Sequence, residues 1–293
     1  MNMLNTTTEH QPDTLSLLSS TPPVLERYEL KYVIPWSLVE PIRRFVAPYC
    51  VLDNHSQEVD GHFYPVNSLY LDSPGFRFLK LRMWGADRRF NMRIRSYGDG
   101  RTGPYFAEIK YRTPTSINKY RTRVSLFEWP GFMGNPGTAS REQPVTDARN
   151  RTLFLRLIES YAVEAKIFTC YKRLAFVSLI DSYARVTFDI NLRYRLQTHL
   201  LSENPWSLEP DQNCINYDTH GTFGDEPWHG DNVILELKTA AGEVPLWMME
   251  LIRRFQLQRV GFSKYMNSSL LGYQDRGFNY MSSDRASPVA CVT

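Results

Sequence analysis

The sequence predicts an α+β domain, mainly antiparallel β, whose sheet closes into a barrel with a polar, basic interior and a few helices packed outside. Charged and bulky residues alternate with a period of two in at least six segments, as they do in β-strands, where successive side chains point to opposite faces. Short turn-type connections join three of these segments, which favours neighbouring antiparallel strands. Arg and Lys occupy the charged face of nearly every strand. These observations together indicate a sheet with one strongly basic face.

The three central strands are predicted at residues 90–97, 105–112 and 117–125. Gly98-Asp99-Gly100 separates the first two, and residues 113–116 separate the next two. Because the side-chain period of a strand is two, each strand gathers its charges on one side. The residues that share these faces are Arg93 and Arg95, then Glu108, Lys110 and Arg112, then Lys119, Arg121 and Arg123.

The remaining elements flank these strands. Ser37 and Glu40 form the pattern of a capping box and predict a helix after Pro35. Phe154, Leu157 and Tyr161 recur at helical spacing and predict a second helix around them. Residues 129–147 have the composition of a loop. Further strands are predicted at residues 25–34, 66–72, 169–179, 182–194 and 233–238, and further helices at residues 76–82 and from Pro245 onward, since proline suits the first turn of a helix.

Composition and length bound the class of protein. The chain has 293 residues, 42% hydrophobic and 22% charged, which is typical of a globular protein with a sizeable core. A net charge of +3 is too small for a protein that coats nucleic acid. No apolar run approaches the roughly 20 residues that span a bilayer. We expect one folded domain at residues 25–273, with a polar insertion at 201–230 and disordered tails at 1–24 and 274–293.

Two sets of metal-ligand residue types are weak candidates. The four cysteines are far apart and form no CxxC motif, which argues against a zinc site or a disulfide framework. His220 and His229, with Asp218 and Asp225, lie in the predicted insertion, but their spacing fits no standard site. A solvated loop is the favoured interpretation of that segment.

The basic strand faces have two interpretations. An open antiparallel sheet with one solvated face is the commonest cause of such alternation. However, an acid recurs two residues before a lysine, at Glu29, Glu108 and Glu236. A barrel with these charges inside requires compensation, because an uncompensated buried ion costs several kcal/mol. A phosphate-bearing ligand and a divalent cation would supply it, which indicates metal-assisted phosphoryl transfer.

A series of short motifs resembles a known family. In order, they are Arg-Tyr-Glu-Leu-Lys-Tyr at 27–32, Ser-Leu-Tyr-Leu-Asp at 68–72, Arg-Ile-Arg-Ser-Tyr at 93–97, Glu-Ile-Lys at 108–110, Lys-Tyr-Arg at 119–121, Leu-Glu-Leu-Lys at 235–238 and Phe-Ser-Lys-Tyr at 262–265. The series resembles the VTC domain of vacuolar transporter chaperone proteins, one of the CYTH-like triphosphate tunnel metalloenzymes. The resemblance runs from about residue 25 to residue 273, although the insertion at 201–230 has no counterpart in the family pattern.

The resemblance implies an eight-stranded antiparallel tunnel that binds ATP or polyphosphate and a divalent metal, Mn²⁺ or Mg²⁺. The implied phosphate-binding residues are Lys31, Arg93, Arg95, Lys110, Lys119, Arg121, Arg173, Arg185, Lys238 and Lys264. The implied catalytic residues are Lys31, Arg93, Arg95, Lys110 and Glu236. Glu236 is the first choice of metal ligand, followed by Glu29 and Glu108.

The leading functional hypothesis is a polyphosphate polymerase that transfers the γ-phosphate of ATP to a growing chain. A tri- or polyphosphate hydrolase on the same tunnel and a non-catalytic polyphosphate or nucleotide sensor are the alternatives, because all three need the same electrostatics. The expected ligands are ATP and polyphosphate, with no nucleic acid. The expected location is cytoplasmic, with a membrane-protein partner and the oligomeric state left open.

Overall fold

The computed structural model describes residues 27–98, 100, 103–114, 117–128, 132, 145–181, 183–197, 232–240 and 242–274. The predicted tail at 1–24, the insertion at 201–230 with its His and Asp residues, and the tail after Gln274 lie outside the described residues. Most of the predicted loop at 129–147 does so as well.

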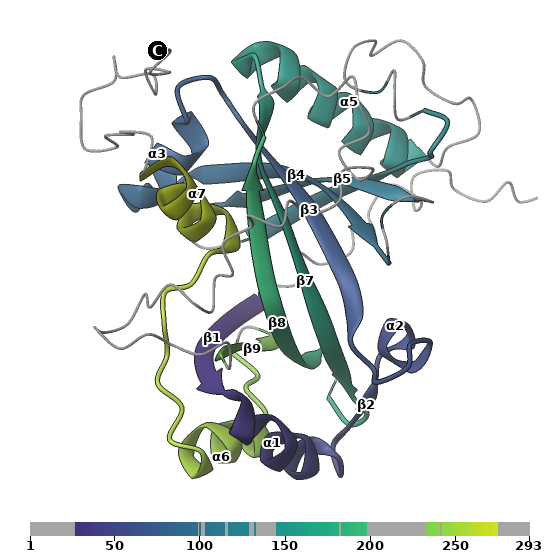
Figure 1. The fold of residues 1–293 in the computed structure, drawn as a ribbon, viewed down its shortest axis with the longest axis vertical. Coiled ribbons are helices and arrows are strands. Elements are labelled where there is room, and N and C mark those ends of the chain that lie inside the picture. The colour runs from purple at the N-terminus through teal and green to yellow at the C-terminus, as the bar shows by residue number, and fades with distance from the viewer. Residues whose placement is uncertain are drawn as a thin grey trace, which may run out of the picture.

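One antiparallel sheet dominates the fold (Figure 1). Its strands follow the spatial order β1-β9-β8-β7-β3-β4-β5-β6, and β2 pairs with β7 beside this path. All the strands predicted from alternation are present, and the long pair β7 and β8 extends beyond the predicted bounds. The strands are β1 (Arg27–Pro35), β2 (Cys50–Leu52), β3 (Tyr64–Asp72), β4 (Arg89–Tyr97), β5 (Tyr105–Arg112), β6 (Ile117–Val124), β7 (Glu164–Ser178), β8 (Ala184–Leu196) and β9 (Asn232–Ala240).

The sheet curls but does not close. Register shifts in the β3–β7 pairing at Tyr70/Leu71 and in the β7–β8 pairing at Cys170/Lys172 locally increase its twist. As a result, β1 and β5 face each other across the concave side, where Lys110 reaches Glu29. β1 and β6 nevertheless end the hydrogen-bonded path through the described strands. The prediction of antiparallel α+β architecture is therefore confirmed, whereas the predicted closed barrel is not supported: the sheet is an open trough.

Helices cover both sides of this sheet. On the convex side, α5 (Val145–Tyr161) packs on β3, β4 and β5 through Phe154. α1 (Val39–Val46) and α6 (Leu246–Arg254) pack on β1, β8 and β9 through Ile42 and Met248. On the concave side, α3 (Arg77–Met83) and α7 (Lys264–Gln274) share a core with Tyr70 and Tyr171. The concave helices therefore occupy part of the trough and leave the rest open.

Local details differ from expectation at several points. The predicted capping box does not form: a 3₁₀ turn (Trp36–Leu38) precedes α1, no side chain caps either element, and Glu40 pairs with Arg43 and Arg44. β2 and the short α2 (Asn54–Gln57) were not predicted, because segments of three and four residues have too few positions to show a period. α6 begins at Leu246, one residue later than the predicted start at Pro245, which is the N-cap residue.

Candidate functional site

The concave side of the sheet holds a cavity of about 810 Å³. Its walls come from β1, β3, β4, β5, β7 and β9 and the first residue of β6, together with α3 and the segment at residues 259–266. Eleven of the lining residues are Lys or Arg, and two are Glu. Seven of the ten predicted phosphate-binding residues line it: Lys31, Arg93, Arg95, Lys110, Arg173, Lys238 and Lys264.

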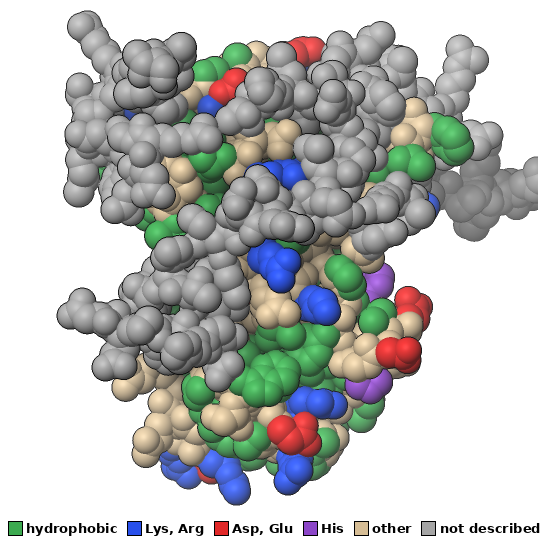
Figure 2. Space-filling model, in the orientation of Figure 1, with side chains coloured by type: hydrophobic (Ala, Val, Ile, Leu, Met, Phe, Trp, Pro, Cys, Tyr) green, Lys and Arg blue, Asp and Glu red, His purple; other side chains and the backbone are tan. Residues whose placement is uncertain are grey.

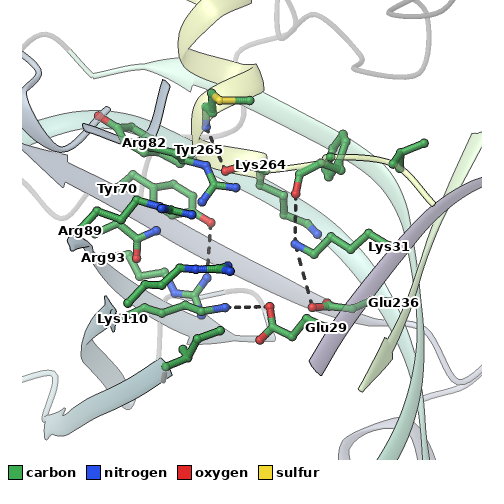
Figure 3. Close-up of a pocket in the computed structure, with 18 of the residues that line it drawn as sticks. Glu29, Lys31, Tyr70, Arg82, Arg89, Arg93, Lys110, Glu236, Lys264 and Tyr265 are labelled. Atoms are coloured by element: carbon green, nitrogen blue, oxygen red, sulfur yellow. Dashed lines mark hydrogen bonds and ion pairs between the residues drawn. The ribbon is translucent and has the colours of Figure 1, made fainter. Parts of the chain in front are cut away.

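Glu236 lies at one wall of this cavity (Figure 3). The register of β1 with β9 places Lys31 opposite Glu236, and Lys238 follows two residues along the same face. The Glu236 carboxylate lies 4.0 Å from Lys31 Nζ, 3.7 Å from Lys238 Nζ and 3.8 Å from Arg173 Nη2. Burial opposes ionisation of Glu236, but these cations outweigh it and hold its pKa well below the usual range. Glu236 is therefore an ionised carboxylate with no cation in close contact.

Asp189 holds two cations of the cavity, Arg173 and Lys264, in place. Its fully buried carboxylate accepts hydrogen bonds from Arg173 Nε at 2.6 Å and Nη2 at 2.8 Å, and from Lys264 Nζ at 2.6 Å. This bidentate geometry fixes the plane of the Arg173 guanidinium. Although burial disfavours the charged form of Asp189, Arg173 and Lys264 lower its pKa to about 2. The sequence placed Asp189 on a strand face but gave no signal that it supports the site.

Arg93 and Arg95 extend from β4 into the opposite wall. Arg93 pairs with Glu108 at 2.8 Å and donates to the Tyr70 hydroxyl at 3.4 Å. Arg95 donates to the Ser68 hydroxyl and to the Tyr171 hydroxyl, each at 3.3 Å, and is buried. The tyrosine and serine hydroxyls, together with Glu108, hold the two guanidinium groups in place. Among the described residues, Arg95 makes no ion pair with a carboxylate.

Glu108 is placed differently from the metal ligand that the resemblance implies. It lies between Arg93, Lys119 and Arg121, with ion-pair distances of 2.8, 2.6 and 3.4 Å. It is buried, and although burial opposes ionisation, Arg93 and Arg95 lower its pKa strongly. Because three cations already surround its oxygens, Glu108 is suited to neutralising charge rather than to binding a metal ion.

Three predicted phosphate-binding residues do not line the cavity. Lys119 and Arg121 lie on β6 beside Glu108, and the Arg121 guanidinium also stacks on Phe106, 3.6 Å from the ring centre. Burial of Lys119 lowers its pKa to about 7, although Glu108 acts in the opposite direction. Arg185 is exposed at the start of β8 and lies over the Tyr183 ring. The alternation placed them on the basic face but could not show how far the cavity extends.

The residues present fit a divalent metal at Glu236 and Glu29. These two acids lie on the neighbouring strands β9 and β1 and line the same cavity. Within the described ranges, no group of three or more His, Cys, Asp or Glu gathers in a way that could hold a metal ion. Mg²⁺ and Mn²⁺ accept one or two carboxylates and complete their coordination with water and phosphate oxygens. A site of two carboxylates facing a phosphate-binding wall therefore suits such an ion.

Several lining residues were not predicted. Arg89 and Arg112 continue the alternation of Arg93 and of Lys110, so the period of two contained a signal for them. Tyr70, Tyr171 and Arg82 gave no such signal, because the direction of a helical or aromatic side chain depends on tertiary packing. All of these residues line the cavity.

This arrangement, an antiparallel sheet curled around a basic cavity with two acids, defines a protein that binds polyanions of the phosphate type. The chain belongs to the VTC domain family, because the family model described as VTC domain matches residues 26–273. This membership confirms the resemblance seen in the sequence and implies nucleotide or polyphosphate binding in general. A search among curated proteins found no match.

Two solved structures are similar at low identity. One is described as a putative adenylate cyclase from Bacillus halodurans, with 12% identity and a TM-score of 0.43 over 81% of this chain and 94% of that chain. The other is a protein from Pyrococcus horikoshii OT3, with 10% identity and a TM-score of 0.39 over 85% of this chain and 98% of that chain. Both similarities are too weak to inform the function.

Proposed function

We propose that the protein is a polyphosphate polymerase that transfers the γ-phosphate of ATP to a growing polyphosphate chain in the basic cavity. The observation that supports it most is the convergence of seven predicted phosphate-binding residues, from five strands and one helix, on one cavity. Phosphoryl transfer needs positioning and charge neutralisation more than covalent chemistry from the protein. The cavity provides both.

The roles of the side chains follow from their places in the cavity. Lys31, Lys238 and Lys264 lie around Glu236 and Asp189 at one wall, and Arg93 with Lys110 faces them (Figure 3). A phosphate chain between the walls would receive charge-assisted hydrogen bonds from both sides, which orients the transferred group. Mn²⁺ or Mg²⁺, held by Glu236 and Glu29, would neutralise charge on the reacting phosphates.

The test is product analysis. The purified protein is incubated with ATP and Mn²⁺ or Mg²⁺, and the products are separated by gel electrophoresis. A polymerase yields a long polymer that an exopolyphosphatase degrades, together with ADP. Release of orthophosphate without polymer would replace the proposal with a hydrolase on the same cavity. Tight binding of ATP with no turnover at any metal concentration would instead indicate a non-catalytic sensor.

A further inference from the structure

Four arginines of the cavity have no role in the function proposed above: Arg82, Arg89, Arg112 and Arg259. Arg89 on β4 and Arg112 on β5 are cross-strand partners in the register of the two strands. Arg82 lies in the last turn of α3. All three line the cavity, and we call them the rim arginines. Figure 3 shows Arg82 and Arg89 on the side of the cavity that faces Lys31 and Glu236. They therefore extend the basic wall away from the proposed metal site.

The rim arginines differ from the other cavity arginines in their partners. Arg93 and Arg173 each pair with a carboxylate, at Glu108 and Asp189. Through the described part of the chain, no rim arginine makes an ion pair. Arg89 donates to the Ala86 carbonyl, while the Nε of Arg82 is buried and has no hydrogen-bond partner among the described residues. The cluster therefore has unused hydrogen-bond donors.

Their arrangement is unfavourable without a ligand. Like charges directly opposite each other on neighbouring strands destabilise a sheet, and Arg89 and Arg112 are such a pair. Burial, and then the charge of Arg89, lower the pKa of Arg82, and burial and Arg112 do the same for Arg89. Asp87 raises the pKa of Arg89, and Tyr70 and then Glu29 raise that of Arg82, but the net shift of both pKa values is downward. An anion between the three guanidiniums would offset their repulsion.

The size of the site indicates which anion. Arg89 and Arg93 lie on the same face of β4, four residues apart, which corresponds to about 13 Å along a strand. An extended chain of phosphates can contact both places at once, whereas one phosphate group cannot. Guanidinium groups bind phosphate oxygens bidentately and suit such a chain.

We propose that the rim arginines form an accessory subsite for the distal phosphates of a polyphosphate chain, beyond the phosphates that react near Glu236. This inference rests on the proposed function. The subsite would hold the acceptor or product chain and would make affinity increase with chain length.

The test is calorimetric titration in EDTA, which prevents turnover, with three ligands: inorganic triphosphate, ATP and a long inorganic polyphosphate. The variants are Arg89→Gln, Arg112→Gln and the double variant, and Arg88→Gln is the matched control because it is exposed and does not line the cavity. We expect the affinity for long polyphosphate to fall by about tenfold for each arginine, which is the usual effect of a charge-assisted hydrogen bond. The affinity for triphosphate should stay within about twofold, and Arg88→Gln should behave as the wild type.

Other outcomes overturn the proposal in recognisable ways. An equal loss of triphosphate and long-chain affinity would place the rim arginines in the triphosphate site itself. A loss for ATP alone would assign them to the nucleoside. No loss for any ligand would show that they do not contact the chain. If the wild-type protein binds none of the three ligands, the proposed function fails, and the subsite fails with it.

Discussion

Glu236 and Glu108 are both acids on the basic face of the sheet, but their surroundings suit Glu236 to binding a metal ion and Glu108 to neutralising charge. The cations around Glu236 lie at 3.7 to 4.0 Å, whereas those around Glu108 approach to 2.6 and 2.8 Å. Glu236 lines the cavity and Glu108 does not. A metal ion therefore has room to replace weak ion pairs at Glu236, while at Glu108 it would have to displace strong ones.

Glu236→Gln tests this assignment. Without the carboxylate, we expect turnover of ATP to fall by about two to three orders of magnitude, as when a major electrostatic contribution to catalysis is removed. Triphosphate binding in EDTA should persist, because Lys31, Lys238 and Arg173 remain. Rates and calorimetric affinities are measured for this variant and for the control Glu250→Gln, whose acid pairs with Arg253 on the exposed face of α6. Wild-type turnover in Glu236→Gln would contradict the metal assignment.

Asp189 gives a prediction about pH. Its pKa is lowered to about 2 in the folded protein, because Arg173 and Lys264 stabilise the carboxylate despite its burial. A lowered carboxyl pKa contributes stability above the pKa of the unfolded chain, and this contribution is lost as the pH falls through the folded value. Between about pH 4 and pH 2, the wild type should therefore lose roughly 2 kcal/mol of unfolding free energy that depends on Asp189.

The measurement is urea unfolding of the wild type and of Asp189→Asn at several pH values in this interval. The variant is expected to be less stable at pH 5, since it leaves two buried cations without their acid. Its stability should then fall less steeply on acidification than that of the wild type. Parallel pH profiles would show that the Asp189 carboxylate is not held ionised by its partners.

At the scale of elements, the end of strand β3 anchors the two helices on the concave side. Asp72, at the end of β3, is fully buried and accepts hydrogen bonds from the backbone N–H groups of Ser73, Phe78 and Leu79, at 2.7 to 2.9 Å. It also accepts one from the Tyr265 hydroxyl at 2.6 Å. Phe76, the N-cap residue of α3, makes no capping hydrogen bond with its own side chain, so Asp72 accepts from the N–H groups of the first turn instead and ties α3 and α7 to the sheet.

Substitutions of Asp72 and Tyr265 should lower the unfolding free energy by different amounts, according to how many hydrogen bonds each one removes. Asp72→Ala leaves several buried donors without a partner and should lower the unfolding free energy by about 3 kcal/mol or more, whereas Tyr265→Phe removes one hydrogen bond and should cost about 1 kcal/mol. Asp72→Asn, which keeps one acceptor, should fall between them. Urea denaturation measures all three. An Asp72→Ala variant no less stable than Tyr265→Phe would exclude this role of Asp72.

The sequence predicted the strands more completely than the helices. Arg93, Arg95 and Lys110 were placed on one face because alternation depends only on local geometry. α7 was not predicted beyond a motif at 262–265, because its apolar residues pack against Tyr70 and Tyr171, which are distant in the chain. Asp72 ends the motif at 68–72, but its role as a helix cap was not predicted, since its partners are brought together by the tertiary fold.

At the scale of the whole molecule, the unexpected feature is the open sheet. Hydrophobic and basic alternation is the same in a closed barrel and in a curled trough, so the sequence could not distinguish them. Curvature depends on bulges and on helix packing, which alternation does not reveal. Basic charge is concentrated in the cavity, whereas Figure 2 shows Lys and Arg singly or in small groups among acidic and hydrophobic side chains on one face.

Side chains connect the edge strand β1 with β5, the strand next to the opposite edge. Lys110 on β5 donates to Glu29 on β1 at 2.7 Å, and no backbone pairing joins these strands. Glu29 is ionised, because Lys110 and Lys238 outweigh its burial and the nearby Glu236 and lower its pKa. The pair is half-exposed, so its contribution to stability is small, about 1 kcal/mol or less. Its importance lies in its competition with ligand phosphate for Lys110.

Glu29→Gln should therefore bind inorganic triphosphate more tightly in EDTA, by up to about fivefold, because Lys110 is released and one negative charge leaves the cavity. With Mn²⁺ present, this gain should disappear if Glu29 helps to hold the metal. Calorimetric titrations with and without Mn²⁺ measure the two affinities, and Glu40→Gln on α1 is the control outside the cavity. Weaker binding of triphosphate by Glu29→Gln in EDTA would contradict this role.

None of the helices in the described part of the chain combines the length and the hydropathy that crossing a membrane requires. The cytoplasmic location, the metal and the polymerase reaction stay predictions from the sequence, and a membrane-protein partner stays open.

The central claim is that ATP reacts inside the basic cavity, and a crystal structure with Mn²⁺ and a non-hydrolysable ATP analogue tests it most directly. We predict density for the phosphate chain inside the cavity, in contact with Lys31, Arg93 and Lys264, with Mn²⁺ bound by Glu236. An analogue bound on the outer surface, or a metal ion distant from Glu236, would contradict the account.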